Sequence, residues 1–160
     1  RRERMVRKMP TKRILMAGSA LNRPTAQGMQ QVMNCWMHID GYELRVAGYG
    51  TIENLQQPQS GNVLMLGAIS DQQMREEMIN CDALLILQPP TTGALTRVQE
   101  ALLAGIPVIA NENAARDYHH VNGLHEYANV EELQEILSKD LDMPSHPKQI
   151  DYTNLLNLIK

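Results

Sequence analysis

The sequence has few of the features that mark secreted, membrane-spanning or repetitive proteins. It contains two cysteines, Cys35 and Cys81, whose separation matches no metal site, so a reducing compartment is favoured. No apolar run approaches the length of a transmembrane span, and we expect no signal peptide. Internal repeats and low-complexity tracts are also missing. These absences favour a cytoplasmic protein with an ordinary packed core.

Neither sign of charge dominates the chain. Its formal net charge is -3, so nothing draws the whole chain to nucleic acid, and we expect no nucleic-acid partner. The charge is uneven, because residues 1–13 are basic whereas the remainder is acidic. A basic end can bind membrane lipid or RNA, but a solvated linker is the simpler interpretation. We therefore predict a basic linker over residues 1–11.

The length of the chain limits its organisation. Its 160 residues suit one domain, or two small ones at most, and are enough to bury a hydrophobic core. The first residue is not methionine, and we expect the chain to be part of a longer protein.

The most informative stretch begins with an apolar run at residues 83–87, Ala-Leu-Leu-Ile-Leu. This run is typical of a buried strand. Pro89 and Pro90 end it, because proline cannot donate to a sheet ladder. Residues 91–93, Thr-Thr-Gly, then predict a small turn.

A helix and a second strand follow this turn. Apolar residues recur with a helical period at Leu95, Val98, Ala101, Leu102 and Gly105. Gly105 suits the left-handed position after a helix, and Pro107 prevents the helix from continuing. Residues 108–110 form the next predicted strand.

This loop and helix suggest an anion site. The loop feeds backbone N–H groups into a helix N-terminus, where the helix dipole favours negative charge. Arg97 and Glu100 lie one turn into the helix and share a face. A cation and a carboxylate placed there could hold a phosphate and a sugar hydroxyl together. A surface ion pair that binds nothing remains the alternative.

The remainder of the chain alternates between predicted strands and predicted helices. The further strands are expected at residues 13–17, 43–47, 63–66 and 124–127. The further helices are expected at residues 29–37, 70–80, 114–118, 129–139 and 150–159, with loops at 20–27 and 51–62. Ser70 with Gln73 and Asn129 with Glu132 are capping pairs. Such alternation predicts an α/β fold with a parallel sheet and helices on both faces.

In sheets of this kind, ligands bind outside the carboxyl ends of the strands. The expected ends are Gly18-Ser19, Gly48-Tyr49-Gly50, Gly67-Ala68-Ile69, Gln88 to Gly93, and Asn111-Glu112. Most of them carry glycine or another small residue, as the close approach of a ligand to the backbone requires. Arg23, in the loop at 20–27, is either a phosphate ligand or an exposed loop residue.

Two other motifs are weaker. Gly48-Tyr49-Gly50 matches the start of a dinucleotide fingerprint, but the third glycine is missing, so a strand-end turn is favoured. His119, His120 and His125 lack a carboxylate at ligand spacing, which favours a loop or surface role. We therefore expect no metal site.

Residues 80–110 resemble the C-terminal half of retaining glycosyltransferases with the GT-B fold, glycosyltransferase family 4. The similarity rests on Asn80-Cys-Asp-Ala-Leu-Leu-Ile-Leu-Gln-Pro and Glu100-Ala-Leu-Leu-Ala-Gly-Ile-Pro-Val-Ile-Ala. The family has Ala-Asp, a hydrophobic run and Pro there, then Glu-Ala, hydrophobic residues and Gly-x-Pro-Val-Val-Ala. The resemblance covers about residues 13–139, and it implies a Rossmann-like sheet that is one half of a GT-B fold.

The resemblance implies a donor site on the same helix. Glu100 matches the second Glu of the family's Glu-x7-Glu motif, which binds the ribose of the nucleotide, whereas the first Glu falls on Thr92. Gly93-Ala94-Leu95 lies where the family's Gly-Phe-Gly amides meet the diphosphate. Thr96 to Glu100 is similar to a variant, Ser-Lys-x-x-Glu, whose basic residue serves the diphosphate, and Arg97 takes that place.

Other family positions depart from the pattern. The usual Arg after the first strand is Ser19 here, and the usual Lys before the helix is Gln27, so Arg23 is a candidate substitute. The resemblance implies Arg97 and Glu100 as the catalytic residues. The implied ligand-binding residues are Gly18, Ser19, Arg23, Gly48, Gly67, Ala68, Thr92, Gly93, Ala94, Leu95, Thr96, Arg97 and Glu100.

The implied function is donor binding in a retaining hexosyltransferase that builds a polysaccharide, glycolipid or similar product. Residues 12–143 would be the Rossmann-like donor-binding domain, and residues 144–160 a loop and C-terminal helix that packs back on it. The nucleotide-sugar, with UDP or GDP, would be the substrate, without a cofactor or metal. An N-terminal acceptor domain of the same protein would be the partner, and the chain by itself would be inactive. The full-length protein would be cytoplasmic, with peripheral contact to the inner face of the membrane.

Three alternatives remain open for this sequence. Thr92, Ser19 and Gln27 are compatible with a non-catalytic nucleotide-binding or scaffold module of the same fold. A nucleotide-sugar epimerase of the same architecture is the second alternative. A generic nucleotide-binding or signalling domain with a Rossmann-like sheet is the third.

Overall fold

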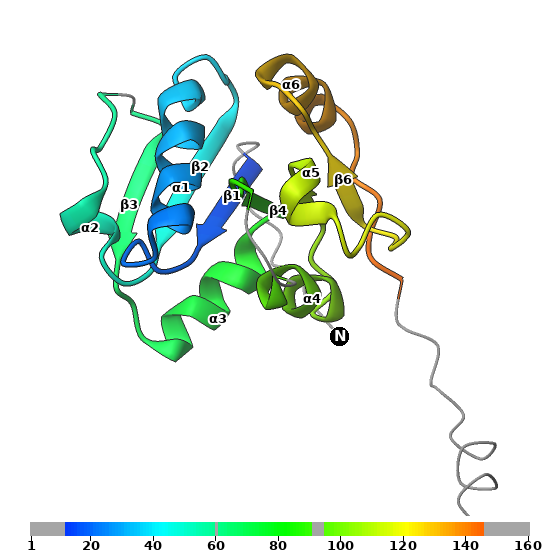
Figure 1. The fold of residues 1–160 in the computed structure, drawn as a ribbon, viewed down its shortest axis with the longest axis horizontal. Coiled ribbons are helices and arrows are strands. Elements are labelled where there is room, and N and C mark those ends of the chain that lie inside the picture. Colours follow the sequence, from blue (N-terminus) through cyan, green and yellow to red (C-terminus); the bar gives the residue numbers. More distant parts are fainter. Residues whose placement is uncertain (1–11, 60, 91–94, 146–160) are drawn as a thin grey trace, which may run out of the picture.

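The computed structural model describes residues 12–59, 61–90 and 95–145. The predicted basic linker at 1–11, the predicted turn at 91–93 and the predicted helix at 150–159 lie outside the described residues. The described chain forms a six-stranded sheet in the order β3-β2-β1-β4-β5-β6 (Figure 1). All five pairings in the sheet are parallel. The predicted α/β fold class is therefore confirmed.

The elements alternate along the described chain. The strands are β1 (Lys12–Ala17), β2 (Tyr42–Ala47), β3 (Val63–Gly67), β4 (Ala83–Ile86), β5 (Val108–Ala110) and β6 (Leu124–Glu126). The helices are α1 (Arg23–Trp36), α2 (Thr51–Asn54), α3 (Asp71–Asn80), α4 (Thr96–Leu103), α5 (Glu112–Ala115) and α6 (Val130–Ser138). The short helix α2 lies within the loop that was predicted at residues 51–62.

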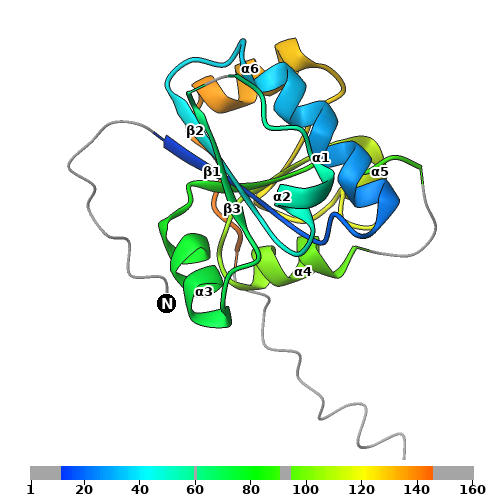
Figure 2. The same cartoon turned by 90° about the vertical axis from the view of Figure 1, so that its left-hand side faces the viewer.

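Two hydrophobic layers enclose the sheet. Figure 2 shows α1 and α6 on one side of it, and α3 and α4 on the other. Successive strand residues point to opposite faces, so Ile14 and Met16 of β1 pack in the layer of α1, whereas Leu15 packs in the layer of α4. Because both faces are covered, the central strand β4 is apolar at every position.

Helix α1 starts earlier than the sequence predicted. Residues 23–27 were expected in a loop, but α1 begins at Arg23 because the side chain of Asn22 accepts from the backbone N–H of Thr25 at 3.2 Å. Proline is tolerated in a first turn, so Pro24 does not delay the helix. The helix expected at residues 29–37 ends one residue earlier, since Met37 follows the last helical residue and is 56% exposed.

Other helix ends follow their predicted signals more closely. Ser70 and Gln73 form the predicted capping box of α3. The side chain of Asn129 accepts from the N–H of Glu132 at the start of α6. Gly105 has a φ of 75° after α4, as the left-handed position requires. Helix α5 was misplaced, since it spans Glu112–Ala115 rather than residues 114–118.

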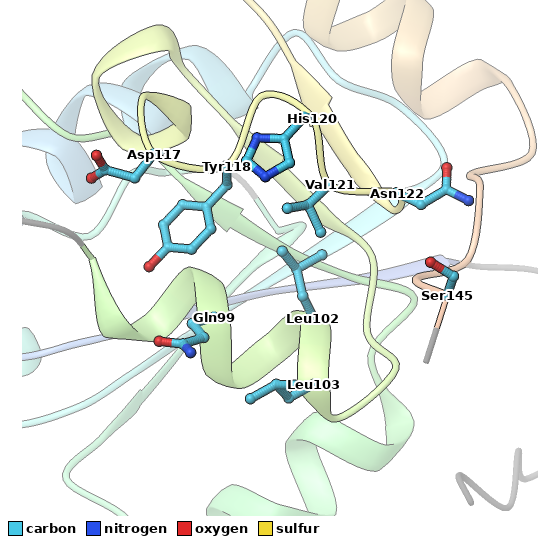
Figure 3. Close-up of a pocket in the computed structure, with 9 residues that line it drawn as sticks. All are labelled: Gln99, Leu102, Leu103, Asp117, Tyr118, His120, Val121, Asn122 and Ser145. Atoms are coloured by element: carbon cyan, nitrogen blue, oxygen red, sulfur yellow. The ribbon is translucent and has the colours of Figure 1, made fainter. Parts of the chain in front are cut away.

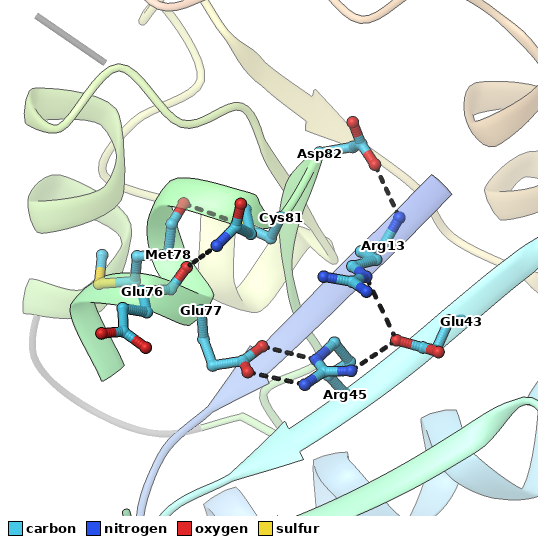
Figure 4. Close-up of polar contacts among 9 residues, drawn as sticks. Arg13, Glu43, Arg45, Glu76, Glu77, Met78, Cys81 and Asp82 are labelled. Carbon is cyan, nitrogen blue, oxygen red and sulfur yellow. Dashed lines mark hydrogen bonds and ion pairs between the residues drawn. The ribbon is translucent and has the colours of Figure 1, made fainter. Parts of the chain in front are cut away.

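An ion-pair network joins helix α3 to the sheet (Figure 4). The guanidinium of Arg45 on β2 donates to both carboxylate oxygens of Glu77 on α3, at 2.6 and 2.7 Å. It also contacts Glu43 at 2.6 Å. The hydrogen bonds to Glu77 hold the pKa of Arg45 above its ordinary value. This network keeps a mostly buried arginine paired, and no local sequence pattern predicts it.

Helix α1 packs closely over the end of β4 at Gly28. A Cβ atom at Gly28 would stand 1.7 Å from the carbonyl oxygen of Leu87. That contact is between backbones, so no side chain can move aside to relieve it. Gly28 therefore sets the distance between α1 and the segment that follows β4. None of the described helices is long and apolar enough to cross a bilayer.

We predict that Gly28→Ala destabilises the protein. A glycine-to-alanine change inside a helix ordinarily stabilises by about 0.5–1 kcal/mol. Here the added methyl group must push α1 off the strand, so we expect a loss of about 2–3 kcal/mol in the free energy of unfolding. Urea unfolding would measure it. Gly61→Ala, where nothing lies within 4 Å of the added Cβ, is the control. A Gly28→Ala protein as stable as the parent would contradict this account of the packing.

Candidate functional site

A pocket of about 360 Å³ opens at the carboxyl edge of the sheet, between the ends of β1 and β4. Strands β1 and β4 are neighbours in the sheet but not in sequence, so the strand order reverses between them. Open α/β sheets bind ligands at such a reversal. The pocket is lined by Gly18, Ser19, Asn22, Pro24, Thr25, Gln88, Leu95 and Arg97.

Arg97 is the charged residue of this pocket. It extends from the first turn of α4 to the end of β1, where Nη1 donates to the carbonyl oxygen of Ala17 at 3.2 Å. Its Nη2 donates to Oε1 of Gln88, also at 3.2 Å. Both partners are neutral, and in the described part of the chain no carboxylate pairs with Arg97. Burial lowers the pKa of Arg97, because desolvation disfavours the charged form.

An anion would complete this arrangement. A partly buried charge is costly unless it is paired, and hydrogen bonds to neutral acceptors compensate only part of that cost. The guanidinium has five N–H donors, and the described contacts use two of its nitrogens once each. Its planar fork suits a carboxylate or a phosphate. The pocket thus has an unpaired cation where a ligand can reach it.

Gly18 makes room for the guanidinium. A Cβ atom at Gly18 would stand 2.2 Å from Nη1 of Arg97 and 3.0 Å from Cγ2 of Thr25. The neighbouring strand end is equally tight, since a Cβ at Gly48 would meet the Gly18 carbonyl oxygen at 1.8 Å. The end of β2 therefore supports the end of β1, and the lack of side chains at both glycines keeps Arg97 in place.

The pocket brings together four of the predicted ligand-binding residues. These are Gly18, Ser19, Leu95 and Arg97. Four further lining residues were not predicted as ligands: Asn22, Pro24, Thr25 and Gln88. Gln88 could have been predicted as a ligand-binding residue, because it lies at one of the predicted strand ends. The other three lie at the early start of α1, where a loop was predicted at residues 20–27.

The remaining predicted residues lie elsewhere or outside the described chain. Gly67 ends β3 and Ala68 follows it, two strands from the pocket, and Gly48 packs against the backbone of Gly18. Arg23, Thr96 and Glu100 are exposed helix residues that do not line the pocket. Thr92, Gly93 and Ala94 lie outside the described residues.

A second pocket, of about 510 Å³, lies between α4 and the segment before β6 (Figure 3). Its walls include the apolar side chains of Leu102, Leu103 and Val121 and the ring of Tyr118. The hydroxyl of Tyr118 donates to the carbonyl oxygen of Leu95 at 3.3 Å, which ties this segment to the start of α4. Among the described residues that line this pocket, Asp117 pairs with Arg116 at 3.5 Å, unlike Arg97 in the first pocket.

The histidines do not form a metal centre with other described residues. In the described ranges, no three side chains of His, Cys, Asp or Glu are grouped as metal ligands. His119 contacts Glu126 through Nδ1 at 2.6 Å, and both side chains are exposed. This is the surface role that the sequence favoured for His119.

Comparisons with known proteins concern the fold. No protein-family model matches the chain, and no curated protein matches it. Sucrose-phosphate synthase from Thermosynechococcus elongatus superposes with a TM-score of 0.61 and 16% identity, over 81% of this chain and 37% of its own. AviGT4, a glycosyltransferase involved in avilamycin A biosynthesis, gives 0.57 and 18%, over 88% of this chain and 46% of its own. WaaG, a glycosyltransferase involved in lipopolysaccharide biosynthesis, gives 0.56 and 20%, over 81% and 38%.

These similarities confirm the predicted architecture. The sheet and its helices match one half of GT-B glycosyltransferases, and the identities are low enough that the likeness shows the fold alone. The chain spans less than half the length of each of these three proteins, between 37% and 46%.

We predict that Gly18→Ala changes the pocket more than it changes stability. The new methyl group would clash with the far end of the Arg97 side chain, which can move aside at little cost. This movement would break the hydrogen bond from the guanidinium to the Ala17 carbonyl oxygen. We expect a loss of about 1 kcal/mol or less in the free energy of unfolding, together with roughly 10-fold weaker binding of pyrophosphate. Urea unfolding and calorimetric titration would measure the two effects. Unchanged pyrophosphate binding in a folded Gly18→Ala protein would contradict the placement of Arg97.

Proposed function

We propose that this chain is the donor-binding part of a glycosyltransferase and binds the diphosphate of a nucleotide-sugar at Arg97. The observation that carries this proposal is the unpaired, partly buried Arg97 guanidinium at the sheet edge where the strand order reverses. The fold shared with glycosyltransferases supports it. A nucleoside diphosphate matches the chemistry of the pocket, because it brings phosphate oxygens to a cation that lacks a countercharge.

The chemical role of such a pocket is electrostatic. In sugar transfer, the nucleoside diphosphate leaves with growing negative charge, and a fixed cation stabilises that charge without reorganisation. Arg97 is held by two neutral acceptors, so its charge remains available for the leaving group. Metal-free stabilisation of the leaving group by Arg97 is part of the proposal, as are hexosyl transfer and the retaining outcome.

The acceptor and several catalytic groups belong, on this proposal, to another part of the protein. The chain spans less than half of the glycosyltransferases that share its fold, between 37% and 46%. The pocket faces outward at the sheet edge, where a second domain could close over it. We propose that the described domain binds the donor and transfers no sugar by itself. The acceptor would be a polysaccharide or glycolipid precursor at the cytoplasmic face of a membrane.

Glu100 is proposed to bind the ribose. It lies on α4, one turn after Arg97, and its carboxylate is exposed and free of hydrogen-bond partners in the described chain. A nucleoside that leaves the pocket along the outer face of α4 would pass this carboxylate. A ribose diol can then donate two hydrogen bonds to it.

We predict that the full chain binds nucleoside diphosphates in the micromolar to millimolar range and that Arg97→Ala weakens this binding. A charged hydrogen bond contributes about 1.5–3 kcal/mol, so the loss should be roughly 10- to 150-fold. Calorimetric titration of UDP, GDP and ADP against both proteins would measure it, with the matching nucleoside as the control. NAD or FMN binding tighter than every nucleoside diphosphate would contradict the proposal and favour a different nucleotide-binding function.

A separate prediction concerns Glu100→Gln. The change should weaken binding of the preferred nucleoside diphosphate by about 1–3 kcal/mol while leaving the melting temperature of the empty protein nearly unchanged. A 2′-deoxy analogue should lose affinity with the parent protein and lose much less with the variant, because both changes remove one hydrogen-bonded pair. Losses that simply add would show that Glu100 does not contact the ribose.

A further inference from the structure

The side chain of Asn111 clamps the backbone of Gln88 just beyond the sheet. Strands β4 and β5 pair up to Ile86 and Ala110, and the prolines after Gln88 cannot continue the ladder. At this point Oδ1 of Asn111 accepts from the N–H of Gln88 at 2.9 Å, and Nδ2 donates to its carbonyl oxygen at 2.9 Å. The Asn111 side-chain amide thus makes the two hydrogen bonds that a neighbouring strand would make. These bonds fix the backbone of Gln88.

The side chain of Gln88 is mostly buried, and one of its hydrogen-bonding groups has no partner among the described residues. Gln88 is 3% exposed and lines the same pocket as Arg97. Its Oε1 accepts from Nη2 of Arg97, and because a guanidinium has no acceptor, the amide atom facing Arg97 must be the oxygen. The orientation of the amide is therefore determined. Its Nε2 has no hydrogen-bond partner among the described residues.

An unused donor in such a position points to a ligand. Nε2 is not among the described side-chain atoms that are both fully buried and unpaired, so it borders the open pocket, where a ligand oxygen can reach it. The two polar atoms of a carboxamide are close neighbours, so Nε2 lies near the guanidinium that Oε1 contacts. One phosphate group has several acceptor oxygens and can accept from both donors. A purely apolar ligand would leave both unpaired.

We propose that Gln88 is a ligand-binding residue whose Nε2 donates to an oxygen of the phosphate held by Arg97, and that Asn111 is the positioning residue which sets its direction. This inference rests on the proposed anion site and adds a second, neutral donor to it. Because the Gln88 amide is neutral, it leaves the positive charge of Arg97 available to the phosphate. A glutamate at position 88 would pair with Arg97, cancel its charge and repel the phosphate.

Pyrophosphate titrated into the full chain tests this inference, with nitrogen-15 NMR observing the side-chain amides. The Nε2 proton signals of Gln88, assigned by their loss in Gln88→Leu, should shift on titration and report the same Kd as the backbone amide of Arg97. Gln88→Leu should weaken pyrophosphate binding roughly 10-fold, since one hydrogen bond to a charged group is lost. Gln88→Glu should weaken it further.

Three more variants separate the roles of Gln88 and Asn111. Gln99→Glu introduces the same charge on α4, two residues from Arg97 but outside this pocket, and should change the affinity less than threefold, since exposed charges are well screened. Asn111→Leu should weaken binding and shift the Gln88 side-chain signals even without pyrophosphate. Asn111→Asp keeps the acceptor for the Gln88 N–H but places a carboxylate oxygen against the Gln88 carbonyl oxygen, so it should also weaken binding and shift these signals.

The outcomes distinguish this inference from the proposed function. If the parent protein binds neither pyrophosphate nor any nucleoside diphosphate, the anion site itself is wrong and both proposals fail. If the parent binds pyrophosphate through Arg97 but the Gln88 amide signals do not shift, Gln88 is only a support for Arg97, and the inference is overturned. Equal effects of Gln88→Glu and Gln99→Glu would overturn it as well.

Discussion

The candidate site of this domain depends on one partly buried cation that has no carboxylate partner in the described chain. Arg97 reaches from α4 across the end of β4 to the Ala17 carbonyl at the end of β1. The strand order makes this contact possible, because β1 and β4 pair in parallel at the point where the strand order reverses. The missing side chains at Gly18 and Gly48 leave the space that the guanidinium and the adjoining strand end occupy. The polar pocket thus follows from the topology of the sheet together with two glycines.

Arg45 has a structural role in the same molecule and provides a comparison for Arg97. Arg45 is held by Glu77 and Glu43, and its pKa is raised by the hydrogen bonds to Glu77. Arg97 has neutral acceptors instead, and burial lowers its pKa. The network of Arg45 is complete within the protein and binds α3 to the sheet. The network of Arg97 is incomplete, which supports a role in ligand binding.

The sequence was sufficient for the architecture and for half of the described pocket. The alternation of apolar strands and amphipathic helices predicted the α/β fold, and Ser70, Asn129 and Gly105 marked helix ends through local signals. Arg97 could be singled out from its place after a strand end. Gln88 and its contact with Asn111 could not, because residues 23 apart in sequence meet there only through the pairing of β4 with β5. The early start of α1 was not predicted, because the loop expected at residues 20–27 includes Pro24, which stands in the first turn of the helix.

The most direct test of the account is to map where a diphosphate binds. Backbone amide shifts of the nitrogen-15-labelled full chain, recorded during titration with UDP or GDP, would locate the site residue by residue. The account predicts that the largest changes occur at Gly18, Ser19, Gln88, Leu95 and Arg97, which lie around the pocket at the β1–β4 edge. Changes centred on Leu103, Tyr118 and Val121 in the second pocket would contradict it. So would an absence of saturable changes at millimolar nucleotide.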